Sequence, residues 1–118
     1  MSEKKLTGVI VMPDKGKAEK ATITDSLDSF YNVLDCTTID IVERRIGGKY
    51  YDIICDDEAP LKELPLVSGV DGLIRPMLFG RLFICHHDDE GGLTSLSEEE
   101  VKAVLSNCHH GFVFSMGY

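Results

Sequence analysis

The sequence of 118 residues lacks any apolar run that approaches the roughly 20 residues a membrane-spanning helix needs. A secretory leader is not indicated either, because the apolar stretch at residues 9–12 is short and stops at Pro13. These absences exclude an integral helical membrane protein. We therefore expect a protein that begins at residue 1 and stays in the cytoplasm, without contact with a membrane.

Paired cysteines are also absent. The four cysteines stand far apart and form no Cys-x-x-Cys pair, which excludes a zinc ribbon and a thioredoxin motif. Three of them lie in apolar segments, where a reduced and buried thiol is the usual outcome. We expect free thiols at Cys36, Cys55, Cys85 and Cys108.

Basic residues are scarce. Lys and Arg number 12 against 20 Asp and Glu, so the formal net charge is −8. An acidic surface repels phosphate backbones, which argues against general nucleic-acid binding. It leaves room for a small anionic ligand held in a local basic pocket, and it is also compatible with a mimic of DNA. The length and the hydrophobic content of 43% suit one domain over residues 1–118.

Catalytic motifs are missing as well. The chain has no Gly-x-Ser-x-Gly, no P-loop, no Gly-x-Gly-x-x-Gly and no nucleophile beside a histidine in a known motif. The run Asp56-Asp57-Glu58 has the chemistry of an acid/base or Mg²⁺ site, but we interpret it as a solvated turn. We therefore predict no catalytic residues and no cofactor.

Secondary structure is indicated by local signals. Residues 6–12 and 18–24 read as strands around a Pro-Asp-Lys-Gly turn, and an apolar stripe follows in a helix from Asp25 to about Cys36. Residues 38–46 and 49–55 form a second hairpin around Gly47-Gly48.

The second half is expected to begin with an ordered loop over 61–76 that holds one short turn of helix. Residues 77–85 are apolar on both faces, which predicts one central strand, and a polar turn follows at 86–92. Ser97 and Glu100 form a capping box for a last helix that stops near Gly111, before a strand at 112–116. The predicted fold is α+β, with a mixed, mainly antiparallel sheet in the order ββαββ-loop-βαβ, covered by two helices.

Four segments of the chain together resemble one known family. They read DSLDSFYNVL, CDDEAPLKELPL, LFGRLFIC and GGLTSLSEEEV, and the resemblance extends from Gly8 to Leu105. It is to the small family of phages and mobile elements described as domain of unknown function 3846. The resemblance implies an accessory gene of the kind that often counters host defence, and it implies no activity.

The four arginines and two adjacent tyrosines suggest a ligand site, since guanidinium groups bind phosphate or carboxylate and tyrosine stacks on a base. Arg81 stands out because it interrupts an apolar segment, and a buried arginine needs a partner. The alternative is an internal ion pair of Arg81 with Glu43, Asp52 or Asp71. The predicted ligand-binding residues are Arg45, Tyr50, Tyr51, Asp57, Arg75 and Arg81.

A second cluster has metal-binding side chains. Residues 86–90 read His-His-Asp-Asp-Glu, and residues 108–110 read Cys-His-His. Adjacent histidines on a strand point to opposite faces, and neither His-x-His nor paired-cysteine spacing occurs. We therefore predict no metal site at His86, His87, His109 or His110.

Taken together, these patterns suggest a protein that binds and sequesters a small anionic, nucleotide-type signal of host defence without catalysis. A compact domain of this size builds an enclosed site most easily between subunits, so we expect a homo-oligomer. One alternative is an acidic module that inhibits a host enzyme, using the carboxylates at 88–90 and 98–100. The other is a small hydrolase that uses Asp56, Asp57 or the histidines.

Overall fold

The structure is a computed structural model, and it describes residues 4–62, 66–68, 78–109, 111 and 113–114. The helices are α1 (Leu27–Leu34) and α2 (Glu98–Ser106), with 3₁₀ turns η1 (Pro13–Lys15) and η2 (Ala59–Lys62). The strands are β1 (Lys5–Met12), β2 (Lys17–Thr24), β3 (Ile39–Ile46), β4 (Lys49–Asp56), β5 (Leu66–Ser68), β6 (Leu78–Phe79), β7 (Leu82–His87), β8 (Leu93–Thr94), β9 (Cys108–His109) and β10 (Val113–Phe114).

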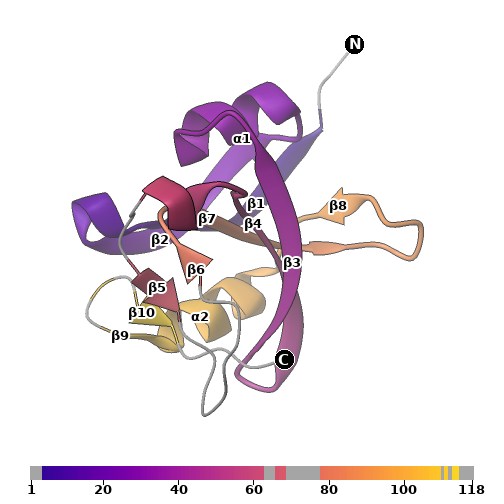
Figure 1. Cartoon of the computed structure of the whole chain (residues 1–118). Coiled ribbons are helices and arrows are strands. Elements are labelled where there is room, and N and C mark those ends of the chain that lie inside the picture. Colours follow the sequence, from indigo (N-terminus) through magenta and orange to yellow (C-terminus); the bar gives the residue numbers. More distant parts are fainter. Residues whose placement is uncertain (1–3, 63–65, 69–77, 110, 112, 115–118) are drawn as a thin grey trace.

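One antiparallel sheet organises the molecule. Its strand order is β2-β1-β7-β4-β3, and β8 adds to the far end of β7. Two small two-stranded sheets, β5–β6 and β9–β10, lie beside it. Figure 1 shows α1 over one face of the sheet and α2 over the other. The predicted α+β class, the mainly antiparallel pairing and the two covering helices are thus confirmed.

The central strand β7 divides the core into two layers. Leu82 and Ile84 belong to the cluster on the α2 side, and Phe83 and Cys85 belong to the cluster on the α1 side. All four are fully buried, as expected for a strand covered on both faces. The helices contribute Phe30 and Leu34 from α1 and Val101 and Val104 from α2.

The prediction of one strand over 77–85 was wrong. The described part of that segment forms β6 and β7, separated by Gly80 and Arg81. Gly80 has a φ of +75°, which bends the chain out of the strand direction and turns Arg81 away from the core. Arg81 therefore does not interrupt a buried strand, because it lies at the bend just before one.

The last helix is shorter than predicted, and the segment before it contains more strand than predicted. Helix α2 ends at Ser106, and Gly111, with a φ of +88°, belongs to the turn between β9 and β10. The polar turn expected at 86–92 is shortened by β7, which continues through His87 before β8 begins at Leu93. The capping box of Ser97 and Glu100 is present as predicted.

Other expectations fall partly or wholly outside the described residues. The expected loop over 61–76 includes the end of η2 and β5, and the rest of it, with Asp71 and Arg75, is not described. The four cysteines are free. No helix in the described part is long and apolar enough to cross a membrane.

Candidate functional site

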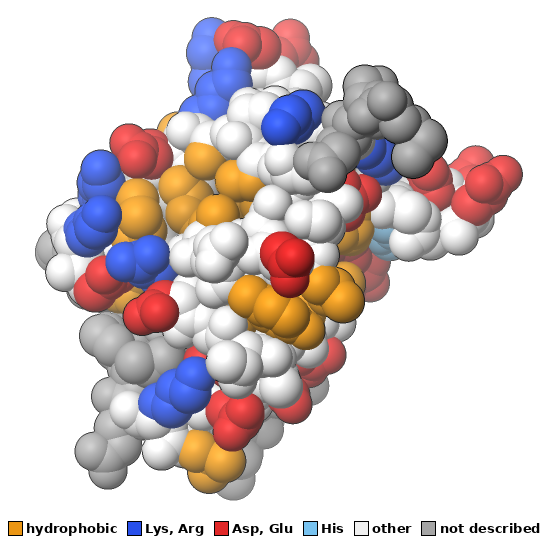
Figure 2. All heavy atoms as spheres, turned by 90° about the horizontal axis from the view of Figure 1, so that it is seen from above, with side chains coloured by type: hydrophobic (Ala, Val, Ile, Leu, Met, Phe, Trp, Pro, Cys, Tyr) orange, Lys and Arg blue, Asp and Glu red, His pale blue; other side chains and the backbone are white. Residues whose placement is uncertain are grey.

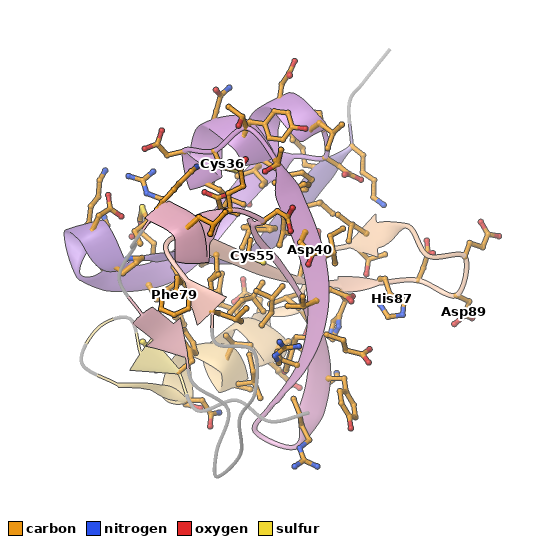
Figure 3. All side chains as sticks on the ribbon, in the orientation of Figure 1. Cys36, Asp40, Cys55, Phe79, His87 and Asp89 are labelled. Carbon is orange, nitrogen blue, oxygen red and sulfur yellow. The ribbon has the colours of Figure 1, made fainter. Side chains whose placement is uncertain are left out.

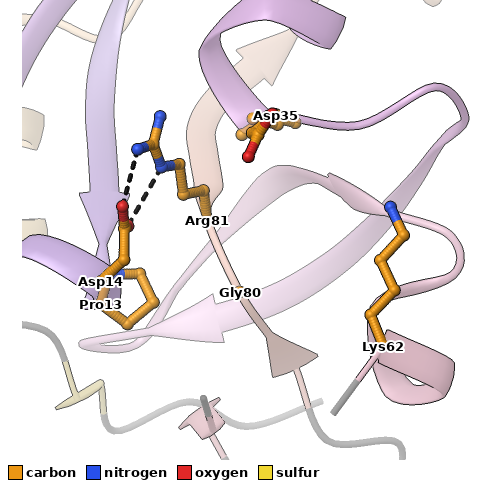
Figure 4. A pocket seen from close by; sticks show the side chains of 7 residues that line it. Pro13, Asp14, Asp35, Lys62, Gly80 and Arg81 are labelled. Carbon is orange, nitrogen blue, oxygen red and sulfur yellow. Dashed lines mark hydrogen bonds and ion pairs between the residues drawn. The ribbon is translucent and has the colours of Figure 1, made fainter. Parts of the chain in front are cut away.

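A pocket of about 310 Å³ lies where the start of β7 meets the end of α1. Its walls come from four separate parts of the chain: η1, the C-terminal end of α1, η2 and the bend before β7 (Figure 4). The lining residues are Pro13, Asp14, Leu34, Asp35, Lys62, Gly80 and Arg81. We call this site the Arg81 pocket.

The guanidinium of Arg81 is held in one orientation. Its Nε and Nη2 donate to the two carboxylate oxygens of Asp14 at 3.1 and 2.7 Å, and Nη1 donates to the carbonyl of Val33 at 3.1 Å. The hydrogen bonding between Asp14 and Arg81 keeps the pKa of Asp14 below its ordinary value and raises the pKa of Arg81. These bonds use three of the five N–H donors that a guanidinium has.

An internal ion pair of Arg81 was expected as the alternative to a ligand role, but with other partners. Neither Glu43 nor Asp52 is the partner, and Asp14 takes that place from the turn η1. The pairing does not close the site, since the Arg81 side chain remains 23% exposed and borders the pocket.

Lys62 provides the second cation. Figure 4 shows it on the opposite side of the pocket from Arg81. Its Nζ lies 2.7 Å from Oδ2 of Asp56, whose side chain is 1% exposed. The hydrogen bond to Asp56 raises the pKa of Lys62, so the amine is charged at neutral pH. Asp56 is thus part of strand β4 and buried, in contrast to the solvated turn that we predicted, whereas Asp57 is exposed.

Helix α1 positions the rest of the pocket. Ser26 caps its N-terminus by accepting a hydrogen bond from the backbone N–H of Ser29, and Leu34 is its last residue. Asp35 follows with a φ of 55°, a left-handed conformation that ends the helix. Leu34, together with Pro13 and Gly80, supplies the uncharged part of the pocket lining.

Of the predicted ligand-binding residues that the structure describes, only Arg81 lines this pocket, and Arg75 lies outside the described residues. Arg45 and Tyr50 are exposed and face each other across the β3–β4 hairpin. Cys55 pairs with Leu82, which directly follows Arg81 of the pocket. Tyr50 lies five residues before Cys55 on β4, so about 16 Å of strand separates Tyr50 from the end of β4 that is next to the pocket. Tyr51 is buried and stacks on His86, with ring centroids 4.8 Å apart.

A cluster around Glu100 was missed at the level of sequence. Glu100 accepts a hydrogen bond from the backbone N–H of Ser97 at 2.9 Å, and its other oxygen binds both Lys49 and His86. These hydrogen bonds outweigh the desolvation of the carboxylate and lower its pKa to about 2. The capping box signalled the contact with Ser97, whereas no local pattern signals the contacts with the two strands.

The adjacent histidines point to opposite faces, as predicted. His86 meets Glu100 on the α2 side, and Nδ1 of His87 lies 2.5 Å from Oδ2 of Asp52 on the other side of the sheet. The two therefore do not share one site. The only described group of three or more potential metal ligands is Glu43, Asp52 and His87, a set that sequence analysis did not propose.

No curated protein and no solved structure matches the chain. One family model does, and it covers residues 6–109, which include all the main strands and both helices. The match takes in the residues of the Arg81 pocket and those of the Glu100 cluster. The chain belongs to the family described as domain of unknown function DUF3846.

Proposed function

We propose that this protein binds and sequesters a small anionic, nucleotide-type ligand in the Arg81 pocket, without catalysis. The observation that carries the proposal is the position of Arg81 and Lys62, two cations from separate elements that line one pocket.

The cations are fixed before any ligand arrives. Asp14 and the carbonyl of Val33 hold the fork of Arg81, and buried Asp56 holds the amine of Lys62. A side chain that is already ordered loses little rotamer entropy on binding, which otherwise costs about 0.5–1.5 kcal/mol for each side chain. The two N–H groups of Arg81 that these bonds do not use are the donors proposed for the ligand.

The size and lining of the pocket suit one small molecule. Its volume of about 310 Å³ is at the lower end of the range for ligand pockets. Pro13, Leu34 and Gly80 offer an apolar surface against which a ring can lie. We infer a ligand no larger than about a mononucleotide, with one anionic group between Arg81 and Lys62.

Asp14 and Asp35 oppose an anion in the same pocket, and this opposition makes the proposal testable. Isothermal titration calorimetry with mononucleotides and cyclic mononucleotides is the first experiment. Arg81→Gln should weaken binding at least tenfold, because it removes the charged fork. Asp14→Asn should strengthen binding severalfold, because it removes a carboxylate that competes for Arg81.

Arg45→Gln is the matched control, since it removes one exposed guanidinium of β3, across from the start of β4 and outside the pocket lining. It should leave the affinity unchanged. The proposal is wrong if none of these compounds releases heat, or if Arg45→Gln weakens binding as much as Arg81→Gln does.

The proposal also covers the origin of the gene, the source of the ligand and the oligomeric state of the protein. We propose that the gene belongs to a phage or mobile element, that the ligand is a host-defence signal in the host cytoplasm, and that the protein is a homo-oligomer. Sedimentation velocity with and without the bound nucleotide tests the last point. A monomer in both states contradicts it.

A second candidate is an acidic module that binds a basic partner protein. Figure 2 shows Asp and Glu side chains on the projecting hairpin, and Figure 3 labels Asp89 there. The second predicted acidic run is less available, because Glu98 pairs with Lys20 and Glu100 with Lys49 and His86. A pull-down that loses its partner with Asp89→Asn and Glu90→Gln, but not with Arg81→Gln, would favour this function.

A further inference from the structure

Three potential metal ligands meet on the α1-side face of the sheet, away from the Arg81 pocket. Glu43 of β3 is directly opposite Asp52 of β4, and Asp52 is in turn opposite Cys85 of β7. His87 lies two residues beyond Cys85 and therefore on the same face. One ligand atom from each of the three side chains lies within 4.8 Å of the others.

Two carboxylates lie directly opposite each other on this face, and Arg45 lies two residues from one of them on β3. The side chain of Asp52 is 10% exposed, and the residue directly across from it is a second carboxylate. Like charges directly opposite each other on antiparallel strands are destabilising, and burial of one of them adds to the cost. Among the described residues, the cationic group that contacts Asp52 is His87, whose ring can supply a single positive charge.

The geometry points to a binding site for one divalent first-row transition-metal ion, held by Glu43, Asp52 and His87. An ion of charge +2 would interact directly with both carboxylates at once. Two carboxylate oxygens and one imidazole nitrogen form a ligand set that suits Mn²⁺ and Zn²⁺. Three protein ligands leave coordination positions for water or for an anionic ligand.

Small side-chain movements would complete the coordination. Ligand atoms at about 2.0–2.2 Å from one ion are about 3–4 Å from each other. The 2.5 Å contact of His87 with Asp52 must therefore lengthen, and any separation near the upper bound of 4.8 Å must shorten. Glu43 is exposed and the His87 side chain is 49% exposed, so both can rotate around the fixed Asp52.

The surroundings increase the local concentration of cations. Asp88 follows His87 directly, and Asp89 and Glu90 form the exposed tip of the same hairpin. Arg45 lies two residues from Glu43 on β3, on the same face, and opposes this effect. The acidic tip attracts any cation without coordinating it, so the experiment must distinguish this general attraction from coordination by the three proposed ligands.

The experiment uses the full chain without a tag and stripped of metal. Mn²⁺ binding is measured from the electron paramagnetic resonance signal of the free ion, and Zn²⁺ binding by competition with a chromophoric chelator. The variants are His87→Ala and Glu43→Gln, both at exposed positions, with folding checked by circular dichroism. Asp89→Asn is the control, because it removes one carboxylate of the tip and no proposed ligand (Figure 3).

We expect one ion per chain, with Zn²⁺ bound more tightly than Mn²⁺. His87→Ala and Glu43→Gln should each weaken both metals at least tenfold, and Asp89→Asn should change the affinity less than threefold. The inference is overturned if neither metal binds saturably up to 1 mM. It is equally overturned if His87→Ala binds both metals as the natural chain does, which would show that His87 is not a ligand of the ion.

Discussion

Substituting Glu100 by Gln tests whether the carboxylate that joins α2 to the sheet acts through its charge. Glutamine at the third position of a helix can still accept a hydrogen bond from the backbone N–H of Ser97, so the capping box survives. The contacts with Lys49 and His86 lose their negative partner. The change therefore separates the charge of Glu100 from its shape.

The magnitude follows from the pKa. Burial disfavours the ionised carboxylate, but hydrogen bonds from Lys49, Ser97 and His86 outweigh it and lower the pKa from 4.5 to about 2. One pKa unit corresponds to about 1.4 kcal/mol, so the upper limit for the stabilisation is about 3 kcal/mol. Lys49 is 57% exposed, and water screens its contribution. We expect Glu100→Gln to lower the free energy of unfolding by about 1–2 kcal/mol at pH 7.

The sign of the pH dependence follows from the same shift. The pKa of Glu100 is lower in the folded chain than in the unfolded chain, so its stabilisation is fully present above pH 4.5 and is lost as the pH falls toward 2. Urea denaturation of the natural chain and of Glu100→Gln at pH 7 and pH 3 should therefore give a gap that narrows in acid. Glu99→Gln, on the exposed side of the same helical turn, is the control. The reasoning fails if the two variants are equally stable at pH 7, or if the gap is as large at pH 3.

Two further predictions concern packing and the thiols. A Cβ at Gly8 would lie 2.1 Å from the carbonyl oxygen of Ile84, so Gly8→Ala should lower the free energy of unfolding by about 3 kcal/mol or more. A Cβ at Gly92 would lie 3.3 Å from the nearest side-chain atom, so the control Gly92→Ala should lower it by less than about 1 kcal/mol. Equal unfolding midpoints of the two variants would contradict this. Burial raises the pKa of Cys55 and Cys85 to about 12. Iodoacetamide at pH 8 should therefore leave both thiols unmodified in the folded chain and modify both in urea, which mass spectrometry can measure. Rapid labelling of these thiols in the folded chain would refute this prediction.

Local signals predicted most of the fold. The turn between β1 and β2, the Gly47-Gly48 hairpin and the capping box of α2 each depend on residues close in sequence, and each is present. The break at Gly80 was missed because a glycine between apolar residues is also compatible with a continuous strand. Strand β9 was missed because Cys108 follows the helical spacing of α2, although the helix ends two residues earlier.

The site was less predictable because its partners are far apart in sequence. Arg81 was singled out as a buried arginine that needs a partner, and it does have one, although it is 23% exposed and lies at a bend. Its partner Asp14 is 67 positions away in a turn whose composition did not suggest an ion pair. The opposite orientation of His86 and His87 followed from the two-residue period of a strand. Their carboxylate partners depend on which strand and which helix pack against β7, and no local pattern encodes that choice.

The length of β7 separates the two proposed sites. Arg81 precedes the strand and His87 ends it, so six residues at about 3.3 Å each place them about 20 Å apart along the chain. A ligand that fills a pocket of about 310 Å³ does not reach across that distance. A substitution at Arg81 should therefore leave metal binding unchanged, and one at His87 should leave nucleotide binding unchanged. A single variant that abolishes both would show that the strand between them had been disrupted, and it would say nothing about either site.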